Sequence, residues 1–217
     1  RSSKALLTII NDVLDFSKIE AGRLVLEPAT VDLRSSVEEV GRLLAAQAME
    51  KGLELLVRYC PGTPRWVIVD GGRLRQILIN LAGNAIKFTD HGHVMLSVEG
   101  ARSANGKIHL SFEVEDTGIG LAPKDKDRIF DKFVQIHNAA SKNRGGAGLG
   151  LAISQHLVQL MGGSLVAQSE PQRGAVFHFE LELPEDLSRA DEPTSDSLSG
   201  LRVLVVDASQ LNRNLVC

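Results

Sequence analysis

Residues 71–88 read GGRLRQILINLAGNAIKF, and this stretch decides the fold. Apolar side chains recur in it at helical spacing and predict a helix with one buried side, formed by Leu74, Ile77, Leu78, Leu81 and Ala85. Asn80, Asn84 and Lys87 follow one another at i, i+4 and i+7 on another side of that helix. An asparagine carbonyl oxygen can share a Mg²⁺ ion with phosphate oxygens, and a lysine can contact a phosphate. The helix alone leaves a solvated polar face open as the alternative.

A glycine-rich stretch, Gly145 to Leu151, leads directly into a second predicted helix from about Leu149 to Met161. The free backbone N–H groups at such a helix start form a cradle for phosphate. The stretch lacks the third glycine of the dinucleotide-binding fingerprint and the Gly-Lys-Ser/Thr of a P-loop. Residues 134–144 before it are polar and aperiodic, which predicts a mobile lid in which Lys142 and Arg144 reach phosphates. A flexible glycine loop without a ligand is the alternative.

A third stretch, Asp116-Thr-Gly118-Ile-Gly120, follows a predicted strand. A carboxylate at a strand end can accept a hydrogen bond from the exocyclic amine of a base, while glycines let the backbone close over the flat ring. Taken alone, the stretch favours an ordinary turn.

The other elements follow from periodicity and turn residues. We expect helices over residues 1–22, ended by Gly22, and 35–51, a short extended piece ending near Leu33, and strands over residues 53–59, 66–69, 94–100, 107–116, 164–168 and 175–183. Because the strands come largely as hairpins, these elements predict an α+β fold, a two-layer sandwich of a mixed sheet with helices on one face. The wide apolar coverage of the first helix predicts that it pairs with another helix, from a second subunit for example.

Composition narrows the class of protein. The chain has 217 residues and a formal net charge of -3, which suits one main domain with fragments of others and disfavours general nucleic-acid binding. Its two cysteines give no disulfide framework. Asn11, Asp12 and Asp15 interrupt the apolar N-terminal stretch, so we expect no membrane span there and a cytoplasmic fragment, whose parent protein can still be anchored through segments absent here.

The three functional stretches together resemble the N, G1 and G2 boxes of protein histidine kinases of the two-component type. The N box spans residues 70–89, the G1 box residues 116–120 and the G2 box residues 146–151, and residues 128–133 resemble the F box between them. Residues 14–22 are similar to the end of the second helix of the family's dimerisation and phosphotransfer hairpin. The resemblance covers about residues 1–185 and implies the Bergerat ATP-binding fold of the GHKL ATPases.

The resemblance also implies roles for individual residues. Asn84 would be the Mg²⁺ ligand, Asn80 a polar partner near the reacting phosphate, Lys87 a phosphate contact and Asp116 the adenine reader. Phe130 and Phe133 would anchor the lid. The full implied ATP and Mg²⁺ site consists of Asn80, Asn84, Lys87, Phe88, Asp116, Gly118, Gly120, Phe130, Phe133, Lys142, Arg144, Gly146, Gly148, Leu149 and Gly150.

Two departures from the family pattern bear on activity. None of the six histidines lies in an H-box sequence, so the phosphoacceptor is expected before Arg1, and Ala147 stands where the family commonly has Thr or Ser. Asn80 cannot serve as the water-activating base that related ATPases carry as a glutamate. The sequence therefore favours a histidine kinase that transfers phosphate for relay to an aspartate, with a non-catalytic nucleotide-binding module as the alternative.

The C-terminal part predicts a second domain. Residues 184–200 are polar and acidic like a linker, and Leu201 to Val206 forms an apolar run typical of a buried parallel strand. Residues 201–217 resemble the first strand and helix of a receiver domain, in which Ala208 replaces one of two acids and suggests a degenerate receiver. We expect the hairpin end at 1–25, the catalytic domain at 26–184, a linker at 185–200 and the receiver-like start at 201–217. The expected partners are a phosphotransfer hairpin, a receiver or response regulator, and a second subunit in the full-length protein.

Overall fold

The computed structural model describes residues 2–103, 106–126, 128–134 and 148–189, with the backbone alone for residues 2–9. The receiver-like segment, most of the predicted lid, and the site residues Lys142, Arg144 and Gly146 lie outside this part of the chain.

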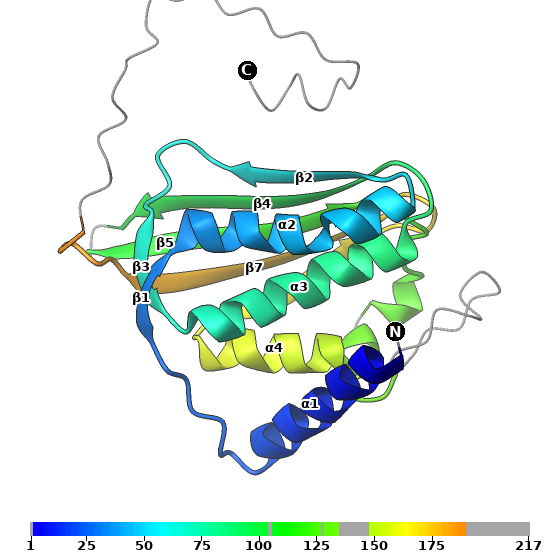
Figure 1. Ribbon diagram of the computed structural model, residues 1–217, viewed down its shortest axis with the longest axis horizontal. Helices are drawn as coiled ribbons and strands as arrows, with labels where there is room; N and C mark the ends of the chain where they lie inside the picture. The colour runs from blue at the N-terminus through cyan, green and yellow to red at the C-terminus, as the bar shows by residue number, and fades with distance from the viewer. Residues whose placement is uncertain (1, 104–105, 127, 135–147, 190–217) are drawn as a thin grey trace, which may run out of the picture.

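The described chain alternates helices and strands (Figure 1). The helices are α1 (Ser2–Glu20), α2 (Leu33–Glu50), α3 (Gly71–Phe88) and α4 (Gly150–Leu160), with short 3-10 turns at Pro123–Asp125 and Arg128–Phe130. The strands are β1 (Ala29–Asp32), β2 (Glu54–Tyr59), β3 (Trp66–Val69), β4 (His93–Arg102), β5 (Lys107–Asp116), β6 (Ser164–Ser169) and β7 (Ala175–Pro184). Within the described residues, every predicted helix and strand is present, and the bounds differ by one or two residues at most ends.

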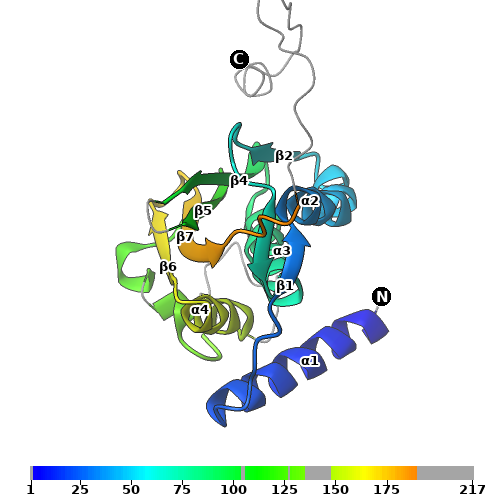
Figure 2. The same cartoon turned by 90° about the vertical axis from the view of Figure 1, so that its left-hand side faces the viewer.

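A five-stranded sheet in the order β2-β4-β5-β7-β6 forms one layer. The β2 strand runs parallel to β4, and all other neighbours are antiparallel, so the sheet is mixed as predicted. Helices α2, α3 and α4 lie side by side across one face of it (Figures 1 and 2). This arrangement confirms the two-layer α+β sandwich.

The core lies between the sheet and these helices. Residues of β5 alternate between buried and less buried positions, which places Ile108, Leu110, Phe112 and Val114 toward the helices. The ring of Phe112 stacks on that of Phe179 in β7, with centroids 4.7 Å apart. Since Asp116 ends this strand, the packing of β5 fixes where that carboxylate lies.

A second sheet consists of two antiparallel strands, β1 and β3, and lies near the start of α2 (Figure 1). The α2 helix begins at Leu33, two residues earlier than predicted, because Asp32 caps it by accepting a hydrogen bond from the Ser35 N–H at 3.0 Å. The Arg65 guanidinium also pairs with Asp32 at 2.7 Å. The Asp32 carboxylate thus connects the end of β1, the start of α2 and the residue directly before β3.

The α1 helix lies beside α4, outside the sandwich (Figure 1). It ends at Gly22 as predicted: this glycine has φ of +62°, and the Arg23 N–H donates to the Lys18 carbonyl at 2.8 Å. Among the described residues, no helix has both the length and the hydrophobicity that a membrane span requires.

The chain stays attached to the sandwich for a few residues after β7. The Arg102 guanidinium pairs with the Glu185 carboxylate at 2.8 Å, and the Thr30 hydroxyl donates to Asp186 at 2.6 Å. Residues directly after Pro184 are therefore held by β4 and β1.

Candidate nucleotide-binding site

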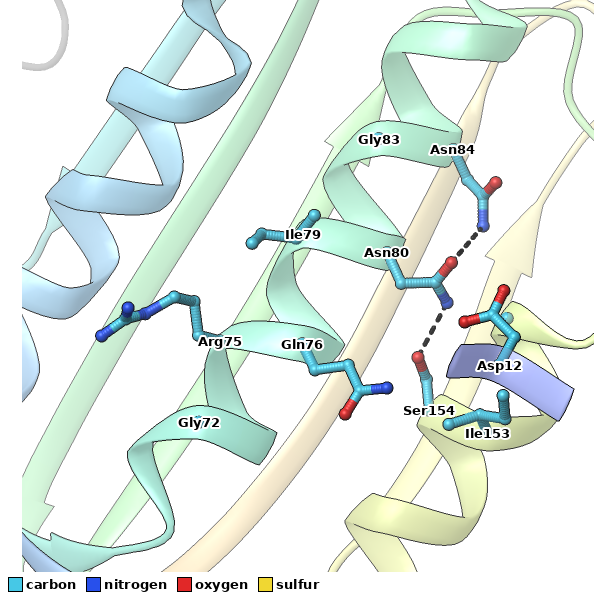
Figure 3. A pocket seen from close by; sticks show the side chains of 11 residues that line it. Asp12, Gly72, Arg75, Gln76, Ile79, Asn80, Gly83, Asn84, Ile153 and Ser154 are labelled. Atoms are coloured by element: carbon cyan, nitrogen blue, oxygen red, sulfur yellow. Dashed lines mark hydrogen bonds between the residues drawn. The ribbon is translucent and has the colours of Figure 1, made fainter. Parts of the chain in front are cut away.

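The polar face of α3 carries the first half of the site. Asp70 caps the helix by accepting a hydrogen bond from the Arg73 N–H at 3.0 Å. The predicted apolar side is buried, and the Asn80 and Asn84 amides lie on the side that faces α4 (Figure 3). The Asn84 Nδ2 donates to the Asn80 Oδ1 at 3.4 Å, and the Asn80 Nδ2 donates to the Ser154 hydroxyl at 2.8 Å. The two amides therefore act as one unit that reaches from α3 to α4.

The start of α4 lies directly against this unit. A Cβ atom added to Gly150 would lie 2.3 Å from the Asn80 Oδ1, so any larger residue there would have to displace the Asn80 side chain. Gly148 has φ of +70°, a conformation that favours glycine, and Leu149 between them is buried. The structure thus brings the described part of the G2 box and the N box into contact.

These elements border a groove of about 500 Å³. It runs along α3 and α4, and its described lining consists of Asp12, Gly72, Arg75, Gln76, Ile79, Asn80, Gly83, Asn84, Gly150, Ile153 and Ser154 (Figure 3). The groove therefore combines amides, a helix start and one carboxylate, which is a suitable environment for phosphate groups and a hard cation.

Asp116 forms a separate part of the site at the end of β5. Its side chain is buried, and burial raises the pKa of its carboxyl, although hydrogen bonds from Gly118, Ala175 and Thr89 lower it. The Gly118 N–H donates to the Asp116 Oδ1 at 2.8 Å. Asp116 is not among the described residues that line the groove.

The glycines after Asp116 allow a close approach of backbone segments. A Cβ on Gly118 would lie 2.5 Å from the Phe88 carbonyl oxygen, and one on Gly120 would lie 2.0 Å from that of Glu170. Lys87 is placed next to this junction, with its Nζ 5.0 Å from the centre of the Phe88 ring. The C-terminal end of α3 and the G1 box are therefore in contact. Such a contact is expected if the N box and the G1 box bind one nucleotide.

The two F-box phenylalanines have different environments. Phe130 is partly buried against the core, whereas Phe133 is 65% exposed. The Phe133 N–H donates to the Gly148 carbonyl at 3.0 Å, and its ring meets that of Phe16 edge-on, with centroids 6.0 Å apart. Phe133 thus connects the glycine-rich stretch to α1.

The docking of α1 was not predicted from the sequence. The Asp15 carboxylate accepts hydrogen bonds from Arg73 at 2.7 Å and Gln76 at 2.9 Å, and Ile19 is buried against the sandwich. The flanking apolar residues Ile10, Val13 and Leu14 stay about half exposed, so the predicted second helix partner remains an expectation. The spacing of Asp12, Asp15 and Phe16 on one helix face was the available signal.

Two further contributors were also missed. Ser154, which anchors Asn80, is 1% exposed. The Lys51 ammonium donates to the carbonyl oxygens of Ile86, Lys87 and Thr89 at 2.7–2.9 Å and so caps the end of α3. Neither residue lies in a recognisable motif, although a lysine directly after a helix is a common capping residue.

The sandwich and its two-part polar site define an ATP-binding domain of the ATPase type. Residues 69–185 match the family model described as "Histidine kinase-, DNA gyrase B-, and HSP90-like ATPase", and the chain belongs to this family.

The chain is also similar to parts of longer sensor histidine kinases. It is 44% identical over 208 residues to the signal transduction histidine-protein kinase BarA of Escherichia coli, and 39% identical over 213 residues to the sensor histidine kinase GacS of Pseudomonas protegens. These alignments cover 95% and 98% of the chain but only 23% of each relative. Among solved structures, full-length ShkA in complex with AMPPNP matches with a TM-score of 0.73 and 39% identity, over 85% of this chain and 37% of that one.

Proposed function

We propose that this chain is the catalytic part of a hybrid sensor histidine kinase, which transfers the γ-phosphoryl group of ATP to a histidine N-terminal to residue 1 for relay to an aspartate. The observation that carries the proposal is the contact of the Asn80 amide, which is hydrogen-bonded to Asn84, with the first residue of α4, Gly150. This contact joins two ATP-binding motifs into one groove.

The groove suits a Mg²⁺ ion held together with phosphates. Mg²⁺ in such sites takes only one or two protein oxygens and completes its shell with phosphate oxygens and water. Asn84 would supply its carbonyl oxygen, and the absence of a side chain at Gly150 lets the Asn80 amide pack against the start of α4. When bound, the ion neutralises charge on the transferring phosphoryl group.

The chain's own residues then bind and orient the nucleotide. Asp116 accepts a hydrogen bond from the adenine amine, Gly118 and Gly120 let the backbone approach the ring, and Lys87 contacts a phosphate. In the transfer step, the bond between the γ-phosphorus and the bridging oxygen breaks, a bond from phosphorus to the acceptor nitrogen forms, and ADP leaves with the electron pair. Positioning and charge neutralisation carry such a step, so the phosphoryl group need not form a covalent bond to a residue of the catalytic domain.

Hydrolysis as the main activity is disfavoured by the same residues. Asn80 cannot accept a proton from water, and its amide is already bonded to Ser154 and Asn84. Of the described residues that line the groove, only Asp12 carries a carboxylate, and it comes from α1 rather than from the ATPase fold.

Binding of a fluorescent ATP analogue tests the site. We expect Asp116→Ala to abolish binding at any Mg²⁺ concentration, and Asn84→Ala to make the remaining binding insensitive to Mg²⁺. Unchanged binding in Asp116→Ala would refute the adenine assignment.

Transfer is tested by complementation. The chain is incubated with γ-labelled ATP and a full-length parent protein whose own site carries Asn84→Ala. Acid-labile label on the parent's histidine is expected. Strong analogue binding without any label on the parent would favour the non-catalytic alternative.

A further inference from the structure

We infer that Ser154 is a positioning residue that fixes the orientation of the Asn80 and Asn84 amides and thereby directs the Asn84 carbonyl oxygen into the groove. The inference rests on the proposed function, in which that oxygen is a Mg²⁺ ligand. It adds a residue of α4 to the metal-binding apparatus of α3.

The hydrogen bonds have a defined direction. The Asn80 Nδ2 donates to the Ser154 Oγ at 2.8 Å, so the Asn80 Oδ1 is on the opposite side of the amide. There it accepts a hydrogen bond from the Asn84 Nδ2 at 3.4 Å. Because the Asn84 amide nitrogen faces Asn80, the Asn84 oxygen lies on the side of the amide away from Asn80, and Asn84 is one of the residues that line the groove (Figure 3).

The opposite orientation of the amides would remove the metal ligand. If the Asn80 oxygen faced Ser154, its amine group would face Asn84 and attract the Asn84 oxygen. The Asn84 amide nitrogen would then take the place of its oxygen, and an amide nitrogen has no free lone pair with which to coordinate a hard cation. The orientation of two amides therefore decides whether the groove can hold Mg²⁺.

Ser154 is well placed to hold the Asn80 amide with its nitrogen toward α4. It lies inside α4, and its hydroxyl oxygen accepts the hydrogen bond from the Asn80 Nδ2 at 2.8 Å. Its side chain is 1% exposed, so water does not compete for the Asn80 amine. Gly150 in the same helix approaches the other end of the Asn80 amide, since a Cβ there would lie 2.3 Å from the Oδ1.

The arrangement links two motifs that are far apart in sequence. Ser154 is one helical turn after Gly150, so any shift of α4 moves the hydroxyl that holds Asn80. The position of the glycine-rich stretch thus influences the metal ligand on α3 through one hydrogen-bonded chain.

The test compares Ser154→Ala with the native chain in a Mg²⁺ titration of fluorescent ATP analogue binding. Residues that orient metal ligands typically contribute roughly 10- to 100-fold to metal affinity. We expect Ser154→Ala to raise the Mg²⁺ concentration for half-maximal binding by about tenfold or more. Affinity for the analogue in EDTA should stay at the native value, because Asp116 is unaffected.

Ser97→Ala is the matched control. The Ser97 Oγ in β4 is also buried, but no hydrogen-bond partner for it is present among the described residues, so this change should leave the Mg²⁺ midpoint as it is. A Ser154→Ala midpoint equal to the native one, while Asn84→Ala shifts it, would refute the inference alone. An equal loss in EDTA and in Mg²⁺ would also refute it, since this result indicates a structural role. An unchanged midpoint in Asn84→Ala would refute the proposed metal site itself.

Discussion

At the scale of single residues, Asp116 combines two opposing requirements. In the proposed adenine site, its charged form is the stronger acceptor for the adenine amine, yet burial disfavours that form and raises the pKa. Hydrogen bonds from Gly118, Ala175 and Thr89 act in the other direction. The carboxylate is thus kept in place by donors that the fold supplies.

This balance predicts a pH dependence of nucleotide binding. Affinity for the ATP analogue should fall as the pH drops through the raised pKa of Asp116, at a higher pH than an ordinary aspartate would give. Thr89→Val removes one donor that lowers this pKa and should move the profile to still higher pH. Binding titrations across the acidic range, with melting checked at each pH, measure both effects, and superimposable native and variant profiles would contradict them.

The sequence indicated some of the site residues but not others. Asn80, Asn84 and Asp116 could be found because each lies in a motif with a chemical reason for its spacing. Ser154 could not, because a single serine in an amphipathic helix carries no signal of what it faces. Its role depends on α3 and α4 packing together, which is a long-range contact that local periodicity does not specify.

Gly150 yields a second prediction at this scale. In Gly150→Ala, the new methyl group would lie 2.3 Å from the Asn80 Oδ1 and must displace that side chain. We expect loss of Mg²⁺-dependent analogue binding with little loss of stability, because alanine favours a helix over glycine by about 1 kcal/mol. Urea denaturation and the Mg²⁺ titration separate the two quantities. Native Mg²⁺ dependence in this variant would show that the Asn80 position is not important.

At the scale of elements, Asp32 holds the small β1–β3 sheet to α2. Burial tends to raise its pKa, but hydrogen bonds from Arg65 and Ser35 outweigh burial and lower the pKa to about 2. An unfolded aspartate has a pKa of about 3.9. Since the folded value is the lower one, this group stabilises the fold above about pH 4, and the contribution is lost as the pH falls toward about 2.

Replacing Asp32 tests this contribution. Asp32→Ala removes the helix cap and the Arg65 partner and should lower the free energy of unfolding by about 2 kcal/mol at pH 7. Asp32→Asn keeps a capping oxygen and should lose less. Urea denaturation between pH 7 and the acid limit should show that the difference between native chain and Asp32→Ala shrinks with acid. A pH-independent difference would mean that the charge contributes nothing.

The elements themselves were predictable, but their pairing was not. Alternation and turn residues located β4 and β5 and their hairpin, because adjacent strands pair through a short connection. Nothing local indicated that β2 lies parallel to β4 or that β1 pairs with β3. Both pairings bring together strands that are separated by other elements, and they depend on how α2 and α3 pack on the sheet.

At the scale of the whole molecule, α1 joins the sandwich through charge and aromatic contacts. Asp15 bonds to Arg73 and Gln76 of α3, and Phe16 contacts Phe133. The sequence indicated an amphipathic helix but not its neighbour, since an apolar face can pack on any complementary surface. The docked helix places Asp12 in the groove beside Asn80 and Ser154 (Figure 3).

This position of Asp12 predicts competition between helix docking and the nucleotide. A carboxylate near the proposed phosphate site repels the triphosphate, and linkage requires that a nucleotide weakens docking to the same extent. Asp12→Asn removes the charge and keeps the helix docked, so it should raise affinity for the ATP analogue in EDTA by about two- to fivefold, the equivalent of ~0.5–1 kcal/mol for charges at a partly exposed site. Asp15→Ala breaks the bonds to Arg73 and Gln76 and should act in the same direction by releasing α1. Both gains should shrink at high salt. If neither variant binds the analogue more tightly, the docked helix and the nucleotide are compatible, and α1 does not restrict access to the groove.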